Sequence, residues 1–170
     1  MFTPAVRFLL LILSGMLAVV FAYMGSVPLI ILCSVFSVVL LWGYYNRGTV
    51  ALAMTKLKKE DFAAAEKIIA KTTHPEKLSQ SQRGYYYFVC AFVEREKNNL
   101  AAAEPLFLRA IAEGLKNDHY KAMALLSLAD MEMVKGRKDI ARDYVLQMKN
   151  LKVQPSLMPA VRRMQEWVGV

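Results

Sequence analysis

The feature that most constrains this chain is a long uncharged stretch near its N-terminus. No charged residue lies between Phe8 and Tyr45, whereas all 14 acidic residues lie beyond Asn46. The stretch divides into two apolar segments joined by a turn: residues 6–24, then Gly25-Ser26, then residues 28–45 with Pro28 at their start. About 17 to 25 apolar residues are enough for a helix to cross a bilayer. The sequence therefore predicts that residues 1–46 form a transmembrane helical hairpin.

Two other interpretations of this stretch compete with a membrane hairpin. A cleaved signal peptide would use Arg7 as its charged region, but a second apolar segment follows at once. The first segment also exceeds the roughly 7 to 15 residues of a signal core. A hairpin buried inside a soluble protein would need more covering chain than the remaining residues provide. Both comparisons favour the membrane anchor.

The flanking charges predict the orientation of such an anchor. Arg7 precedes the first segment, Arg47 and Lys56 follow the second, and the turn between them has no charge. The positive-inside rule then places both termini in the cytoplasm, with the aromatic residues of Trp42–Tyr45 at the lipid headgroups. We therefore expect an integral protein of a bacterial inner or plasma membrane, with the lipid bilayer as one partner.

Beyond Asn46 the sequence repeats itself with a period of 38 residues, which is typical of stacked helical units. The recurring positions are Leu52, Cys90 and Leu128; Ala53, Ala91 and Ala129; Ala65, Ala103 and Ala141; and Ile69, Phe107 and Val145. Small residues at fixed positions let two helices approach closely, and large ones fill the space between neighbouring pairs. Stacking then completes a core that no single pair could form.

Each repeating unit reads as two helices joined by a short turn. Apolar residues recur at helical spacing, as at Leu125, Leu128 and Met133, and no stretch alternates with a period of two. Gly136 is expected to end a helix in a left-handed conformation. The expected helices are one that begins near residue 47 and ends at Lys58, followed by helices at 62–71, 81–97, 100–113, 118–135 and 138–150. We predict an all-α domain at 47–170, with repeats at 47–79, 81–116 and 118–151 and a capping helix at 156–168.

These repeats resemble the tetratricopeptide repeat (TPR) family. The second unit fits the family pattern best, with Tyr87, Cys90-Ala91, Ala103, Phe107 and Ala110. The departures are Thr49 and Thr72 in the first unit, Met148 in the third, and, in place of the family's usual Tyr, Lys56, Glu94 and Glu132. The resemblance covers residues 46 to about 150. It implies a short α-solenoid of about three helix pairs, closed at its end by the capping helix.

No group of residues in the sequence is typical of an active site. His74 and His119 have no Cys, His or carboxylate at ligand spacing. Cys33 and Cys90 form no motif, and the glycines form no phosphate-binding loop. Basic residues alternate with acidic ones, which is typical of solvated helix surface. We therefore expect a protein that is not an enzyme, with no catalytic residue, metal, cofactor or nucleic-acid partner.

The TPR resemblance implies that residues of the first helices line a groove for a peptide or amphipathic helix of a protein partner. The positions that match are Tyr85, Phe88, Phe92 and Arg95 in the second unit and Met123, Leu126, Asp130 and Met133 in the third. The alternative is that these side chains pack against the second helices. Trp167 is expected to pack against the third repeat rather than to bind a ligand.

The leading hypothesis is a membrane-anchored scaffold or adaptor for protein–protein interaction, which presents this groove at the cytoplasmic membrane face. The alternative is an accessory structural or assembly subunit of a larger membrane complex or homo-oligomer, contacted mainly through the hairpin. An enzyme with an unrecognised site is a third hypothesis. Fold resemblance alone does not name the partner.

Overall fold

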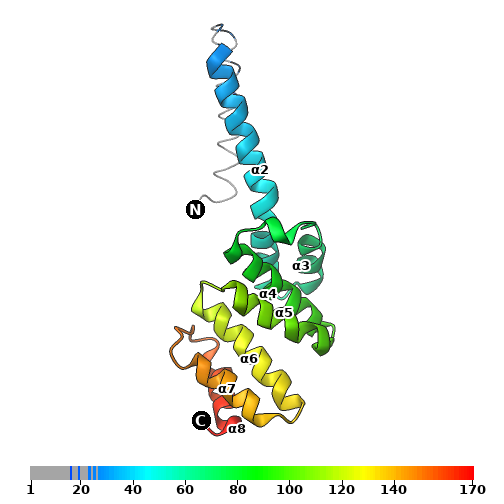
Figure 1. Cartoon of the computed structure of the whole chain (residues 1–170), viewed down its shortest axis with the longest axis vertical. Coiled ribbons are helices and arrows are strands. Elements are labelled where there is room, and N and C mark those ends of the chain that lie inside the picture. The colour runs from blue at the N-terminus through cyan, green and yellow to red at the C-terminus, as the bar shows by residue number, and fades with distance from the viewer. Residues whose placement is uncertain (1–15, 17–18, 20–22, 24, 26) are drawn as a thin grey trace. The chain divides into compact units, whose positions relative to one another are not determined.

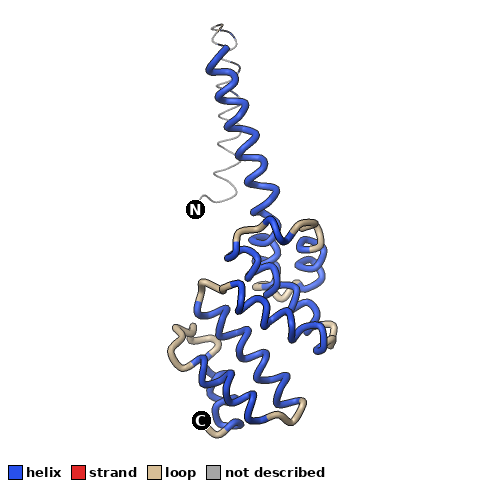
Figure 2. Tube along the Cα trace, viewed as in Figure 1, coloured by secondary structure: helices blue, strands red, loops and turns tan. Residues whose placement is uncertain are grey.

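The computed structural model describes residues 16, 19, 23 and 25 and the continuous stretch 27–170. Every regular element in that part of the chain is a helix, which confirms the all-α prediction (Figure 2). The elements are α2 (Val27–Leu57), α3 (Phe62–Ile69), the 3₁₀ helix η1 (Pro75–Lys77), α4 (Gln80–Glu96), α5 (Leu100–Glu113), α6 (Asp118–Val134), α7 (Lys138–Met148) and α8 (Met158–Val168), as labelled in Figure 1. From α3 onward their ends agree with the predictions to within two residues. The chain divides into two compact units, Met1–Gly48 and Thr49–Val170.

The predicted membrane hairpin and localisation require a correction. A bilayer span needs about 20 consecutive, mostly apolar residues in one helix. In the part of the chain that the structure describes, no helix is long and apolar enough to cross a membrane. The prediction of an integral membrane protein with two cytoplasmic termini is therefore wrong by this criterion. The first predicted span, residues 6–24, lies almost entirely outside the described residues.

The second predicted span lies in α2, which joins it without a break to the helix predicted to end at Lys58. The sequence pattern ended this helix at Tyr45 and began a new one at residue 47. In the structure α2 continues without interruption to Leu57, through Arg47 and Lys56. No proline follows Pro28 before the end of this helix, so every backbone N–H can join the helical hydrogen bonds. A change from apolar to charged side chains does not by itself end a helix.

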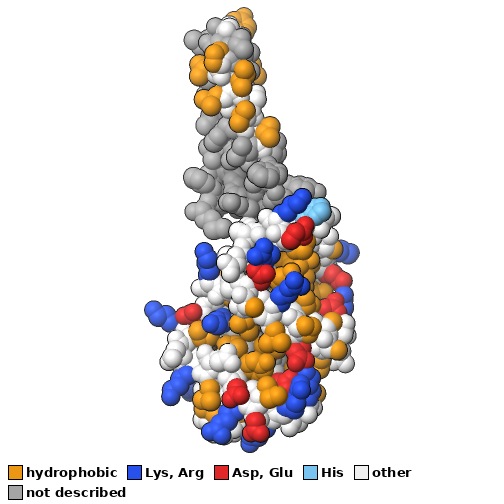
Figure 3. Space-filling model, in the orientation of Figure 1, with side chains coloured by type: hydrophobic (Ala, Val, Ile, Leu, Met, Phe, Trp, Pro, Cys, Tyr) orange, Lys and Arg blue, Asp and Glu red, His pale blue; other side chains and the backbone are white. Residues whose placement is uncertain are grey.

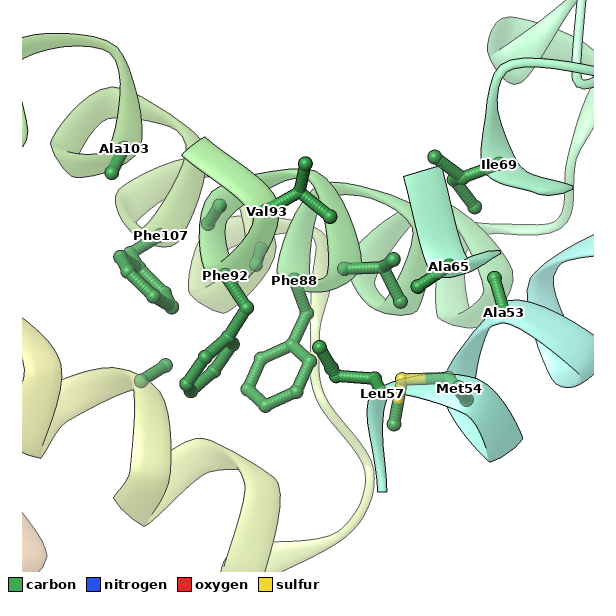
Figure 4. Packing of buried hydrophobic residues seen from close by; sticks show 14 of the residues in the cluster. Ala53, Met54, Leu57, Ala65, Ile69, Phe88, Phe92, Val93, Ala103 and Phe107 are labelled. Carbon is green, nitrogen blue, oxygen red and sulfur yellow. The ribbon is translucent and has the colours of Figure 1, made fainter. Parts of the chain in front are cut away.

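The helices of the unit Thr49–Val170 pack mainly against their neighbours in sequence. Each helix from α3 to α8 contacts the next one, and α8 also contacts α6. The alanines of the 38-residue repeat lie inside this packing, and all six are completely buried: Ala53, Ala91, Ala129, Ala65, Ala103 and Ala141. Ala53 on α2 and Ala65 on α3 belong to one core cluster, shown in Figure 4. Both alanines are completely buried, as expected for the small residues of a helix pair.

Aromatic side chains fill the larger spaces in this core. Phe88 and Phe92 on α4 lie with their ring centres 4.8 Å apart, and the ring of Phe92 is 5.0 Å from that of Phe107 on α5. Figure 4 shows the ring of Phe88 between that of Phe92 and Leu57 of α2. Phe88 and Phe107 are fully buried. Rings tilted or edge-on at such distances add to the stability that burial alone supplies.

The turns inside the three helix pairs have the same backbone geometry at 38-residue spacing. Glu60, Asn98 and Gly136 all adopt left-handed backbone angles, with φ of 57°, 61° and 74°. The residue after each of them donates its backbone N–H to the carbonyl oxygen five positions earlier, at 3.1, 2.9 and 2.8 Å. The left-handed residue predicted at Gly136 is confirmed. Gly adopts this conformation without steric cost and Asn tolerates it, so the turn at Glu60 is strained relative to the turn at Gly136.

The second and third pairs each have a cluster of polar side chains at the turn between their two helices. On α4, Glu94 accepts hydrogen bonds from Lys97 and from Asn99, the residue that precedes α5. In the third pair, Glu132 and Arg137 occupy the positions that correspond to Glu94 and Asn99. The Nε atom of Arg137 lies 2.6 Å from the Glu132 carboxylate. The lysine of each cluster also reaches back to the preceding pair: Lys97 to Glu66 and Lys135 to Glu104. These contacts give a role to the charged residues that stand late in the first helices.

The first pair has its own polar contacts. Lys56 pairs with Asp61 at 3.2 Å, at the positions that Glu94 and Asn99 occupy in the second pair. Thr72 donates a hydrogen bond to Thr49 at 3.0 Å. Both threonines depart from the repeat pattern, and the structure shows that they contact each other. The two departures of the first unit from the repeat pattern therefore form one hydrogen bond.

Candidate functional site

A groove of about 430 Å³ lies among the first helices of the second and third pairs and the C-terminal helix. Its lining comes from three elements: Phe92 and Arg95 on α4; Met123, Leu126, Ser127 and Asp130 on α6; and Leu157, Ala160, Arg163, Met164 and Trp167 on or next to α8. All of these residues belong to the unit Thr49–Val170. Pockets of this volume commonly hold peptides or small ligands.

The lining is mostly apolar, with a few charged side chains. Phe92 and Met164 are almost completely buried, whereas Met123 and Leu126 are half-buried and open to the groove. Met side chains adapt their shape to different apolar partners, so such a surface suits a peptide side chain better than a rigid polar ligand. On the face of the unit drawn in Figure 3, hydrophobic side chains gather between groups of charged ones.

Arg95 is held in a defined position at the edge of the groove. Its guanidinium donates a hydrogen bond to the hydroxyl oxygen of Ser127 at 2.6 Å, and its Cζ lies 5.2 Å from the ring centre of Phe92. Ser127 in turn donates its hydroxyl proton to the backbone carbonyl of Met123 at 2.9 Å. The ring and the hydroxyl together restrict the guanidinium plane. This arrangement leaves most of the five N–H donors of Arg95 for other partners.

The C-terminal helix α8 forms one wall of the groove. Val161, Met164 and Val168 are buried against the third pair, and this packing fixes the helix. Pro159 lies in its first turn, where a missing N–H costs nothing, and Gly169 ends it in a left-handed conformation. The helix predicted at 156–168 is therefore present, at residues 158–168.

Trp167 does not occupy the position predicted for it. The sequence predicted that this ring packs against the third repeat, but 58% of its surface is exposed and it lines the groove. The neighbouring Val168 makes the buried contact instead. A one-residue difference on a helix rotates a side chain by about 100°, and the pattern of residues 161–168 does not distinguish these two faces.

Of the eight residues predicted for the groove, five line it: Phe92, Arg95, Met123, Leu126 and Asp130. The other three lie elsewhere. Phe88 is fully buried in the core, 5.6 Å from the ring of Tyr120, and Tyr85 contacts the edge of the same Tyr120 ring at 5.7 Å. Met133 packs at the side of the cluster formed by the third pair and α8. The sequence reasoning missed Ser127 and the whole α8 wall.

The reactive side chains of the unit have structural surroundings. Burial raises the pKa of the Cys90 thiol to about 11, so little reactive thiolate forms near neutral pH. His74 pairs with Glu76 at 2.8 Å on an exposed turn. The described residues contain no group of three or more His, Cys, Asp and Glu side chains that could hold a metal ion.

Comparison with known proteins supplies no relative for this site. No protein-family model, curated protein or solved structure matches the chain significantly. The resemblance to TPR proteins therefore remains a prediction that rests on the residues quoted above. The function has to be argued from the groove itself.

Proposed function

We propose that the chain is a non-enzymatic scaffold or adaptor that binds a peptide or helix of a protein partner in the groove between α4, α6 and α8. One observation carries the proposal: a groove of about 430 Å³ opens Met123, Leu126 and Trp167 to the surface. Exposed tryptophan is costly to leave in water and is enriched at the centres of protein interfaces. A partner that covers this ring and its apolar neighbours gains the free energy of their burial.

The fold that supports this proposal is a short TPR-like α-solenoid with α8 as its cap. In such an architecture each unit packs on its neighbours, and the first helices share one face. The groove lies on that set of helices, because α4 and α6 are the first helices of their pairs and α8 follows the third pair. The 38-residue repetition of buried alanines and left-handed turns supports the same assignment.

A second candidate function is that of an accessory structural subunit, contacted through the N-terminal unit. The observation that favours it is a set of large apolar side chains on the N-terminal half of α2 that are more than half exposed: Ile31, Leu32, Val35 and Val38. Continuous exposed apolar surface commonly marks a contact with another molecule. The two candidates use different units, so one experiment can separate them.

Photo-crosslinking tests which surface meets the partner. We would place the photoreactive residue p-benzoylphenylalanine at Met123 in the groove, at Leu146 on α7, or at Val35 on α2, one position per variant. Leu146 is the matched control, since it is an exposed apolar residue outside the groove lining. Each variant is illuminated in the cells that make the protein, and its adducts are identified by mass spectrometry.

The proposal predicts one dominant protein adduct from position 123 that position 146 does not give. Adding Trp167→Ala to the position 123 variant should then reduce that adduct strongly. A specific adduct from position 35 alone would favour the accessory-subunit candidate. Equal adducts from positions 123 and 146 would contradict the groove.

A further inference from the structure

The charged groups of the groove indicate which peptides it accepts. Arg95 and Arg163 contribute two positive charges and Asp130 one negative charge, so the lining carries a net charge of +1. Among the described residues, neither arginine forms an ion pair with a carboxylate, including that of Asp130. Lys97, Lys135 and Arg137, by contrast, all pair with glutamates in the turn clusters. The groove therefore has free cationic groups beside apolar surface.

Arg95 is the better placed of the two arginines to bind a carboxylate. The Phe92 ring and the Ser127 hydroxyl hold its guanidinium before any ligand arrives, so less side-chain entropy is lost on binding. A planar guanidinium can donate two parallel hydrogen bonds to one carboxylate. The adjoining apolar side chains of Met123 and Leu126 offer contacts to the apolar part of the same segment.

On this basis, and resting on the proposed function, we infer that the groove selects apolar protein segments that carry one Asp or Glu side chain, which Arg95 binds. The net charge of +1 matches a single carboxylate, and Asp130 disfavours a cluster of acidic residues. A chain terminus is a poorer match. The groove is lined by side chains of helices whose backbone N–H groups are used in helical hydrogen bonds, whereas a C-terminal carboxylate is commonly held by free backbone donors.

The test uses the full chain and a display library of random 12-residue peptides whose C-termini are blocked. Selection on the wild-type chain should enrich peptides with one acidic residue among apolar ones. An enriched peptide is then synthesised with its acidic residue as Glu or as Gln, and its affinity is measured by fluorescence anisotropy. We expect the Glu→Gln change in the peptide and the Arg95→Gln change in the protein each to weaken binding about tenfold.

The two changes should not add, since both remove the same contact, and a double-mutant cycle measures this coupling. Arg142→Gln on α7 is the control, because Arg142 is exposed and lies outside the groove lining. It should leave the affinity unchanged. Circular dichroism should show the same helicity for wild type and Arg95→Gln, because Arg95 is exposed.

The outcomes separate this inference from the proposed function. Enriched peptides without an acidic residue would overturn the inference. If their binding is still lost on Trp167→Ala, the groove remains the binding surface. Enrichment that requires a free C-terminus would also overturn the inference in favour of a terminal carboxylate. Failure to enrich any peptide, or binding that is unaffected by Trp167→Ala, would overturn both.

Discussion

In the unit Thr49–Val170, the 38-residue period fixes the side chains between paired helices but not those that line the groove. In the pairs, equivalent positions keep equivalent side chains, as in the buried alanines Ala53, Ala91 and Ala129. In the groove, equivalent positions differ: Phe92 of α4 corresponds to Asp130 of α6. Positions that decide how helices pack have few alternatives. Positions that line the groove differ between the helices, so the groove is not symmetric.

The largest expected effect separates a core aromatic residue, Phe88, from one that lines the groove, Trp167. Phe88→Ala should lower the free energy of unfolding by about 4 kcal/mol, because it empties a fully buried site in the aromatic cluster. Trp167→Ala should lower it by less than about 1 kcal/mol, since 58% of that ring is already in water. Urea unfolding of the full chain, followed by circular dichroism, measures both. Equal losses would mean that Trp167 belongs to the core.

The next effect compares the two polar clusters. Glu132→Gln should cost about 2 kcal/mol, because only 2% of its side chain is exposed and it pairs with both Lys135 and Arg137. Glu94→Gln should cost about 0.5 kcal/mol, since its side chain is 26% exposed and water can replace the lost contact with Lys97. Urea unfolding again gives both values. A larger loss of stability for Glu94→Gln than for Glu132→Gln would contradict this ranking of the two clusters.

The pH dependence of stability tests whether the charge of Glu132 causes the effect of Glu132→Gln. Burial raises the pKa of Glu132, but the hydrogen bonds from Lys135 and Arg137 outweigh it and hold the pKa below its ordinary value of 4.5. A lowered pKa in the folded state means that this stabilisation is complete above 4.5 and is lost as the pH falls through the folded-state pKa. The stability difference between wild type and Glu132→Gln should therefore shrink below pH 4.5. A difference that stays constant in acid would exclude the charged contact as its cause.

The smallest effect distinguishes the three left-handed turns. Gly136→Ala should destabilise the chain by about 1 kcal/mol, because an L side chain strains a residue with φ of 74°. Glu60→Gly, at φ of 57°, should relieve a strain of similar size and stabilise the chain by up to about 1 kcal/mol. Glu60→Ala keeps the strain and is the control. If Glu60→Gly destabilises the chain more than Glu60→Ala does, the turn is not strained.

Much of the packed unit could be predicted from sequence, because its determinants are local and periodic. Helix ends, the alanine contacts and the Gly136 turn all follow from spacing and from the conformations that each residue allows. The period does not show how deeply each of a set of equivalent residues is buried. Leu52, Cys90 and Leu128 are equivalent in sequence, yet they are exposed, half-buried and buried, because the first pair of the unit has a neighbouring pair on one side only.

The groove was predicted only in part, for a physical reason. A first helix of a pair is apolar around most of its surface, so the sequence does not show that Phe88 faces the core while Phe92 reaches the groove. The α8 wall depends on how the chain returns after α7, which no local pattern records. The N-terminal prediction had a different fault: it inferred a helix end from a change in hydropathy, and α2 continues through that point.

The most direct test of the central claim uses Trp167 as a reporter of groove occupancy. The chain has two tryptophans, at positions 42 and 167, so Trp42→Phe leaves Trp167 as the only one. A peptide enriched on the wild-type chain is titrated into this variant, while anisotropy of its label reports binding independently. The account predicts that Trp167 emission shifts to shorter wavelength and saturates together with the anisotropy, because the peptide removes the exposed ring from water. Full binding by anisotropy with unchanged Trp167 emission would contradict it.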